Sequence, residues 1–177
     1  MSISDVTGRR ICQRSPVDSV ACCLAGTPKV SVRRPRRNTT MSTMCGTAAE
    51  CRSLLWEKRA ELLRLADALP SGRSDRQAKA KLEHELEEFE EAHSGGDEVG
   101  AFTEIGDIVY YCVKAEFNRL LTEYEVSKIL ASACLKLKCS PTDAFNSSII
   151  KYRLRAEINH NKDDQSEREA ITAYLGL

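Results

Sequence analysis

The chain has 177 residues, of which 42% are apolar and 29% charged, as is usual for one globular domain with a tail. Its net charge is zero, but residues 1–50 carry eight Arg or Lys and three acids, whereas residues 51–177 carry eighteen and twenty-three. This mildly acidic body argues against a nucleic-acid partner. No run of eighteen apolar residues occurs, so we expect no transmembrane helix and no membrane partner.

The basic leader, residues 1–45, is rich in Ser, Thr, Pro and Arg and shows no helical or strand periodicity. The favoured interpretation is a disordered tail. An Arg-rich, acid-poor organelle-targeting leader is a second interpretation, and a true first residue at Met41 or Met44 is a third. A nucleic-acid-binding arm is less favoured, because the basic cluster is short and lacks aromatic residues.

The cysteines show neither a Cys-x-x-Cys pair nor zinc-ligand spacing with histidine. We therefore expect all of them to be reduced, which predicts a cytoplasmic protein unless the leader directs it to an organelle. The eight are Cys12, Cys22, Cys23, Cys45, Cys51, Cys112, Cys134 and Cys139.

Helical periodicity begins at Cys51 and continues to Pro70. A second helix is predicted from Ser74, with Gln77 three residues later in capping-box position, to about His93. The "SGG" stretch breaks it, and Asp97 can cap a third helix that runs to about Leu121.

The fourth helix is predicted to start at Thr122, where Glu125 completes a capping box, and to reach about Lys138. Ser140 followed by Pro141 starts a fifth helix that runs to about Ile158, and a short last helix covers about 166–174. These elements predict an all-α domain over 46–177, an antiparallel bundle with its core at about 74–138 and C-terminal helices at 141–177.

An acidic stretch from Lys81 to Tyr111 holds ten acids in thirty-one positions. On an ideal helix, the second helix has an apolar side that includes Leu82, Leu86 and Phe89. Glu85 falls inside this apolar arc and Glu88 at its border. The other glutamates fall on the opposite side, where solvent is expected: Glu83, Glu87, Glu90 and Glu91.

The third predicted helix is apolar on almost every side, yet it carries Glu104 and Asp107, which share one face. Two adjacent helices thus each offer an inward pair of acids. Burying such charges costs several kcal/mol unless they are paired or bind a metal. A divalent oxygen-liganded cation is one solution, and Mg²⁺ fits best when substrate phosphates complete its octahedron. The alternative is buried salt bridges to Lys81, Lys114 or a basic residue of another helix.

The stretches "ELEEFEEA" (85–92) and "EIGDIVYY" (104–111) resemble the E-x-x-E…E-x-x-D signature of the MazG-like all-α nucleoside triphosphate pyrophosphohydrolases. The shared pattern covers about 81–115, and the helical layout extends it to about 138. The resemblance implies a dimeric or tetrameric helical bundle that hydrolyses an NTP or dNTP to the monophosphate and pyrophosphate. It implies Mg²⁺ held by Glu85, Glu88, Glu104 and Asp107, with the catalytic roles at Glu85 and Glu88, where one carboxylate orients or deprotonates the attacking water.

The chain departs from the family pattern at several positions. His84 and Thr103 stand where many relatives carry a second glutamate, and Lys114 stands where many carry asparagine. Lys114 is interpreted either as a phosphate contact or as a residue that flanks the bundle. The downstream Lys/Arg pair of relatives has a loose counterpart in Lys136 and Lys138, of which Lys136 is the better candidate for a phosphate contact.

A second hypothesis keeps the bundle without catalysis. In it, the chain is a helical interaction protein whose acids form interhelical salt bridges. Trp56 is interpreted as a core or interface residue rather than a stacking platform for a base. Glu116 projects toward the apolar side of its helix and is expected to pair with Lys or Arg of a neighbour.

Overall fold

Six helices form the part of the chain described by this computed structural model, which is residues 44–70, 72–158 and 163–176. This part contains no strand, so the predicted all-α class is confirmed. The expectations for residues 1–43, with Cys12, Cys22 and Cys23, lie outside the described residues. The helices are α1 (Met44–Asp67), α2 (Ala78–Ser94), α3 (Glu98–Phe117), α4 (Glu123–Leu137), α5 (Pro141–Glu157) and α6 (Asp164–Leu175).

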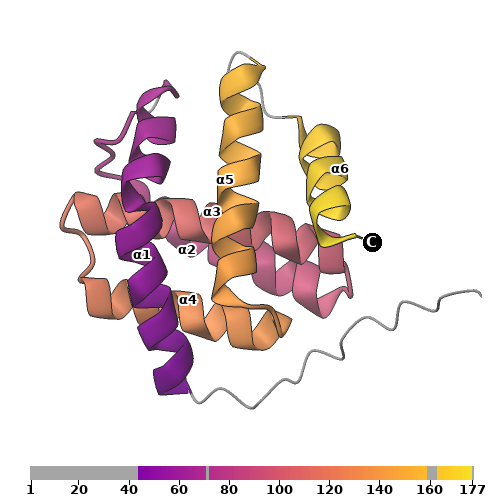
Figure 1. Ribbon diagram of the computed structural model, residues 1–177, viewed down its shortest axis with the longest axis horizontal. Coiled ribbons are helices and arrows are strands. Elements are labelled where there is room, and N and C mark those ends of the chain that lie inside the picture. Colours follow the sequence, from indigo (N-terminus) through magenta and orange to yellow (C-terminus); the bar gives the residue numbers. More distant parts are fainter. Residues whose placement is uncertain (1–43, 71, 159–162, 177) are drawn as a thin grey trace, which may run out of the picture. The chain divides into compact units, whose positions relative to one another are not determined.

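Helices α2 and α3 lie side by side and are joined by the short loop 95–97 (Figure 1). In the same view, α1 and α5 run across the direction of α2, α3 and α4, and both contact α3. Helix α6 packs beside α5 and also reaches α3. Helix α3 therefore has neighbours on most sides, and fourteen of its twenty residues are buried, as its sequence predicts.

Three helix starts follow from local chemistry as expected. The Asp97 carboxylate accepts a hydrogen bond from the Gly100 amide at the start of α3. Thr122 and Glu125 form the predicted capping box of α4, and Ser140 caps α5 ahead of Pro141. Each of these capping signals spans no more than four consecutive residues, so it can be recognised from the sequence alone.

The predicted cap at Ser74 is wrong. Helix α2 begins at Ala78, and its N-cap residue Gln77 makes no side-chain capping bond. The reason is Asp75, whose carboxylate accepts from the Gln77 amide and from Lys81 and so holds a turn in place of a first helical turn.

Helix α1 begins at Met44, seven residues before the expected start at Cys51 and inside the predicted leader. Thr47 is 3% exposed and lies one helical turn before the fully buried Cys51. The buried side of α1 therefore begins at least one turn before Cys51, where the apolar pattern of the sequence begins.

Gly106 sets the distance between α3 and α5. A Cβ at this position would lie 3.0 Å from Ser147 Oγ and 3.3 Å from the Ser147 carbonyl carbon, so a larger residue would push the helices apart. Ser147 Oγ also donates a 2.7 Å hydrogen bond to the Phe102 carbonyl. This close approach lets residues of the next turn of α5 reach the acids of α3.

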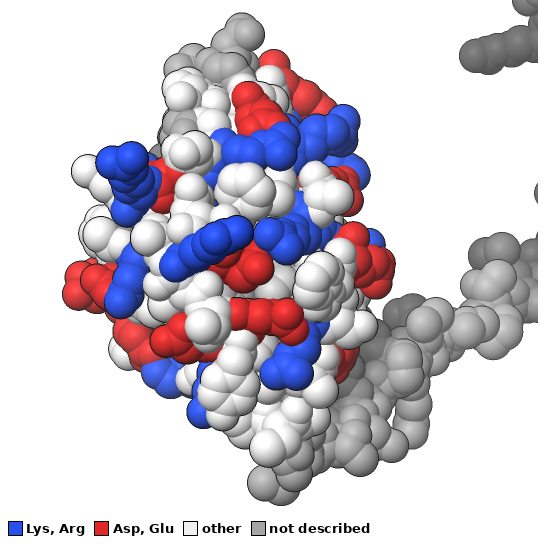
Figure 2. All heavy atoms as spheres, turned by 90° about the vertical axis from the view of Figure 1, so that its left-hand side faces the viewer, with Lys and Arg blue, Asp and Glu red and all other residues white. Residues whose placement is uncertain are grey.

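Trp56 on α1 is 63% exposed, so the core interpretation of this residue is wrong. The Arg59 guanidinium lies 5.9 Å from the centroid of its ring. The face of the molecule shown in Figure 2 carries acidic and basic side chains interspersed rather than one patch of a single sign. Within the described residues, no helix combines the length and the apolar character needed to cross a bilayer.

Candidate metal centre

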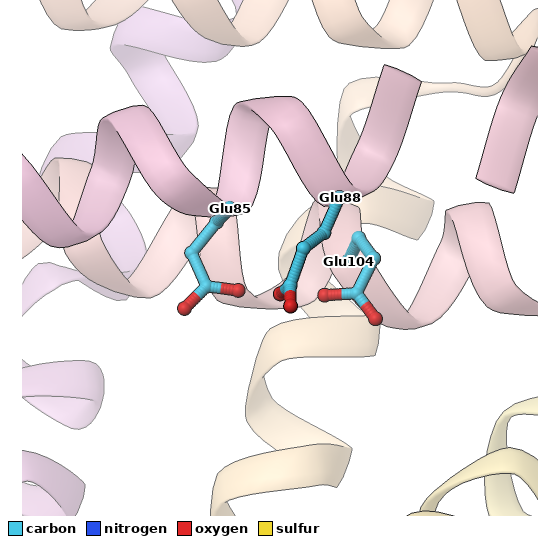
Figure 3. Close-up of side chains that lie close together, drawn as sticks. All are labelled: Glu85, Glu88 and Glu104. Atoms are coloured by element: carbon cyan, nitrogen blue, oxygen red, sulfur yellow. The ribbon is translucent and has the colours of Figure 1, made fainter. Parts of the chain in front are cut away.

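Three carboxylates meet where α2 faces α3. Glu85 and Glu88 extend from α2 and Glu104 from α3, and their side chains point into one small volume (Figure 3). One oxygen from each lies within 4.8 Å of the other two, and all three residues are half-buried. These are three of the four acids that the sequence predicts to face inward.

The helical repeat explains why Glu85 lies there. Leu82, three residues earlier, and Phe89, four residues later, are 2% and 1% exposed and anchor the buried side of α2. A residue between them on the same stripe must face α3. The four glutamates predicted for the opposite side are all exposed, as expected: Glu83, Glu87, Glu90 and Glu91.

The cluster carries an electrostatic cost. Burial, together with the negative charges of Asp107, Glu104 and Glu88, raises the pKa of the Glu85 carboxyl to about 8, while Lys151 acts in the opposite direction. Near neutral pH, Glu85 therefore retains a proton in the absence of a cation. A bound cation would favour the ionised form and reverse this effect.

Asp107, the fourth predicted ligand, is 3% exposed and is not part of this group of three. Its Oδ2 accepts from Lys151 Nζ at 2.6 Å, and its Oδ1 accepts from the Tyr152 hydroxyl at 2.7 Å. For Asp107, the structure thus contains the salt bridge to another helix that the sequence left open as an alternative.

Helix α6 completes this buried network. Glu167 is fully buried and accepts two hydrogen bonds from the Arg155 guanidinium, at 2.5 and 3.0 Å. Lys151 Nζ lies 3.4 Å from Glu167, and Arg155 lies 3.5 Å from Asp107. Two cations of α5 are thus shared by an acid of α3 and an acid of α6.

The residues predicted from the sequence do not include Lys151, Arg155 or Glu167. The sequence does contain a pattern that indicates Lys151 and Arg155. Lys151 and Arg155 are four residues apart on α5, on the stripe that also carries the buried Ser147 and Ser148. Two basic residues on an inward face, opposite two inward acids of another helix, favour pairing between them.

The two lysines predicted to contact phosphate have other surroundings. Lys114 is fully buried, and its Nζ lies 3.1 Å from the Asp75 carboxylate and 5.2 Å from the centroid of the Tyr110 ring. Lys136 pairs with Glu90, on the side of α2 that points away from the carboxylate cluster. The structure does not bring Lys136 to the predicted centre.

The three carboxylates satisfy the basic requirements of a Mg²⁺ site. Their donors are oxygens, which Mg²⁺ prefers, and at about 2.1 Å from the ion two opposite oxygens are about 4.2 Å apart. A separation within 4.8 Å needs only small rotations of flexible glutamate side chains. Comparisons of this chain with protein-family models, with curated proteins and with solved structures find no match.

Proposed function

We propose that this chain is a Mg²⁺-dependent nucleoside triphosphate pyrophosphohydrolase, which converts an NTP or dNTP to the monophosphate and pyrophosphate. The observation that carries the proposal is the convergence of Glu85, Glu88 and Glu104 within 4.8 Å on two packed helices. Structural salt bridges do not require three acids together, because like charges repel. The resemblance of residues 81–115 to the MazG-like family supports the same reaction.

In the proposal, Glu85, Glu88 and Glu104 hold the ion. When bound there, Mg²⁺ would neutralise charge on the triphosphate and lower the pKa of a coordinated water. Glu85 and Glu88 orient the attacking water, and one of them accepts its proton. Asp107 is held in place by Lys151 and Tyr152 and maintains the negative field behind the cluster.

Lys81 is the better-placed cation for a phosphate. It lies on α2 one turn before Glu85, its side chain is 37% exposed, and its Nζ lies 5.8 Å from the centroid of the Tyr111 ring. We propose Lys81 in place of Lys136 as the contact for the departing pyrophosphate. Lys114 is buried and shares the Asp75 carboxylate with Lys81, so Asp75 already compensates Lys114 as well as Lys81.

The finer features implied by the resemblance belong to the same proposal. They are an antiparallel MazG-like bundle, assembly as a dimer or tetramer, and action on cytoplasmic nucleotides. The exposed aromatic residues Trp56 and Tyr124, at 63% and 56% exposure, are suitable contacts for such an assembly.

The second candidate function is a helical interaction protein without catalysis. The pairs that favour it connect different helices: Asp107 with Lys151, Glu116 with Arg59 at 3.1 Å, and Asp97 with Arg168 at 2.8 Å. They show that this chain uses many acids for interhelical pairing. In this view the carboxylate cluster serves no chemistry.

Hydrolysis assays distinguish the two candidates. The chain is incubated with millimolar Mg²⁺ and a panel of NTPs and dNTPs, and monophosphate and pyrophosphate are separated by ion-exchange chromatography. We expect turnover that is lost in Glu85→Gln and Glu104→Gln and kept in Glu87→Gln, the same substitution on the exposed side of α2. A folded wild-type chain without turnover on any nucleotide would favour the interaction protein.

A further inference from the structure

Three thiols lie together near the end of α4, and none of them belongs to the carboxylate cluster. Cys134 is in the last turn of α4, Cys139 follows two residues after the helix ends, and Cys51 comes from α1. Cys51 and Cys134 are buried in one hydrophobic cluster, and Cys139 packs against it. All three are free, as are Cys45 and Cys112 among the described residues.

The backbone explains the contact between Cys134 and Cys139. Lys138 adopts the left-handed conformation, with φ at 54°, and ends the helix. The Cys139 amide then donates a 3.0 Å hydrogen bond back to the Cys134 carbonyl. In this type of helix ending, the side chains of these two positions commonly meet, so the proximity is built into the fold.

The three thiols differ in access to solvent. Cys51 and Cys134 are 0% and 1% exposed, whereas Cys139 is partly exposed. Hydrogen bonds with Cys139 and Cys51, together with burial, raise the pKa of the Cys134 thiol, so Cys134 rests in the protonated form until its neighbour is oxidised. A small oxidant in solution therefore meets Cys139 first.

We propose that Cys139 and Cys134 form a peroxide-sensitive disulfide site. The Cys139 thiolate attacks one oxygen of hydrogen peroxide, the O–O bond breaks, and the hydroxide that leaves is protonated to water. Cys139 is then a sulfenic acid, oxidised by two electrons. The Cys134 sulfur attacks the Cys139 sulfur, the S–O bond breaks, and a second water leaves with the proton of Cys134.

Cys51 extends this chemistry to a second helix. Its thiolate attacks the Cys134 sulfur of the disulfide, a Cys51–Cys134 bond forms, and Cys139 leaves as a thiolate, with no net change in oxidation state. The product joins α1 to α4. Both disulfides contain Cys134, because this thiol is the common neighbour of the other two.

Peptide mapping tests the proposal. The reduced full chain is treated with an equimolar amount of hydrogen peroxide, remaining thiols are alkylated, and an unreduced tryptic digest is analysed by mass spectrometry. Lys136 and Lys138 separate Cys134 from Cys139, so a disulfide between them appears as two linked peptides. We expect this linkage in the wild type and in Cys112→Ala, a matched change at another fully buried thiol.

Cys134→Ala should form neither disulfide and should instead accumulate oxygen adducts on Cys139. Cys139→Ser keeps Cys134 and should yield only the Cys51–Cys134 linkage, more slowly, because the entry point for peroxide is removed. Wild-type chains that collect oxygen adducts on Cys139 without any disulfide would overturn the proposal. So would an intramolecular disulfide between Cys51 and Cys139 that forms equally well in Cys134→Ala.

Discussion

Replacing Glu85 with glutamine is expected to stabilise the metal-free protein while removing its response to Mg²⁺. The substitution keeps the shape of the side chain and removes its charge from the cluster with Glu88 and Glu104. Most substitutions of a half-buried residue destabilise a protein, so a gain in stability is a distinctive outcome.

The size of the gain follows from the separations. At 4.8 Å, two unit charges repel by roughly 0.9 kcal/mol in bulk water and by roughly 3.5 kcal/mol at an effective dielectric constant of about 20. Glu85 repels two neighbours, but all three side chains are half-exposed and are screened by solvent and salt. We therefore expect Glu85→Gln to add about 1–3 kcal/mol to the free energy of unfolding at pH 9. For a domain of this size, the increase in Tm is roughly 4–12 °C.

The assay is thermal unfolding followed by circular dichroism, with EDTA and with increasing Mg²⁺. Selective binding to the folded wild type adds about 1.4 kcal/mol at ten times the Kd and about 2.7 kcal/mol at one hundred times the Kd. Glu85→Gln lacks one of three carboxylates and should show little of this increase. The Tm curves of the two proteins should therefore approach each other, or cross, as Mg²⁺ rises.

Glu87→Gln is the control, because it makes the same chemical change on the exposed side of the same helix. It should leave both the metal-free Tm and the Mg²⁺ response unchanged. A Glu85→Gln protein that gains no stability in EDTA and keeps the wild-type Mg²⁺ response would show that the three carboxylates neither repel one another nor bind the ion.

Three further outcomes follow from the structure. The pKa of Glu85 is raised from 4.5 to about 8 in the folded protein, so between these pH values the folded protein holds a proton that the unfolded chain has lost. The free energy of unfolding therefore falls as pH rises from about 4.5 to 8. Without metal, Tm measured from pH 5 to 9 should therefore fall more in wild type than in Glu85→Gln, and equal slopes would contradict this. Lys151→Met should cost about 3–5 kcal/mol in urea unfolding, because it leaves Asp107 without its closest cation, and adding Asp107→Asn should restore part of the loss; no recovery would refute the pairing. Gly106→Leu should lower stability by more than about 1 kcal/mol, since a side chain meets Ser147 at 3.0 Å, and an unchanged urea midpoint would mean that α3 and α5 are not in close contact.

The parts of the fold that the sequence predicts correctly are those with a short-range cause. Asp97 and Thr122 cap their helices through bonds that span three residues, so reading the chain in order is sufficient. The apolar stripe of α2 likewise assigns Glu85 to the buried side through helical geometry alone. The predicted cap at Ser74 is wrong because the Asp75 carboxylate binds the Gln77 amide and Lys81; Asp75 also binds Lys114, which is thirty-nine residues further along the chain.

The partners of the inward acids depend on tertiary structure. A helical repeat shows that Asp107 faces inward, but it does not show which helix lies opposite. Lys151 is forty-four residues away, and it reaches Asp107 because Gly106 and Ser147 allow α3 and α5 to approach closely. From the sequence alone, a bound metal ion and a lysine of another helix account equally well for the buried charge of Asp107.

The sequence by itself determined the helical class, the starts of α3, α4 and α5, and the inward direction of Glu85, Glu88 and Glu104, because hydrogen bonds and side-chain directions within one helix depend on residues a few positions apart. Only the tertiary structure separated Asp107, bound to Lys151, from the three acids that remain together. It also showed that Lys136 pairs with Glu90, on the side of α2 that points away from the carboxylate cluster, and that Cys51 packs near Cys134. These assignments depend on which helices pack together, and that is decided by the fit of whole surfaces rather than by any short stretch of sequence.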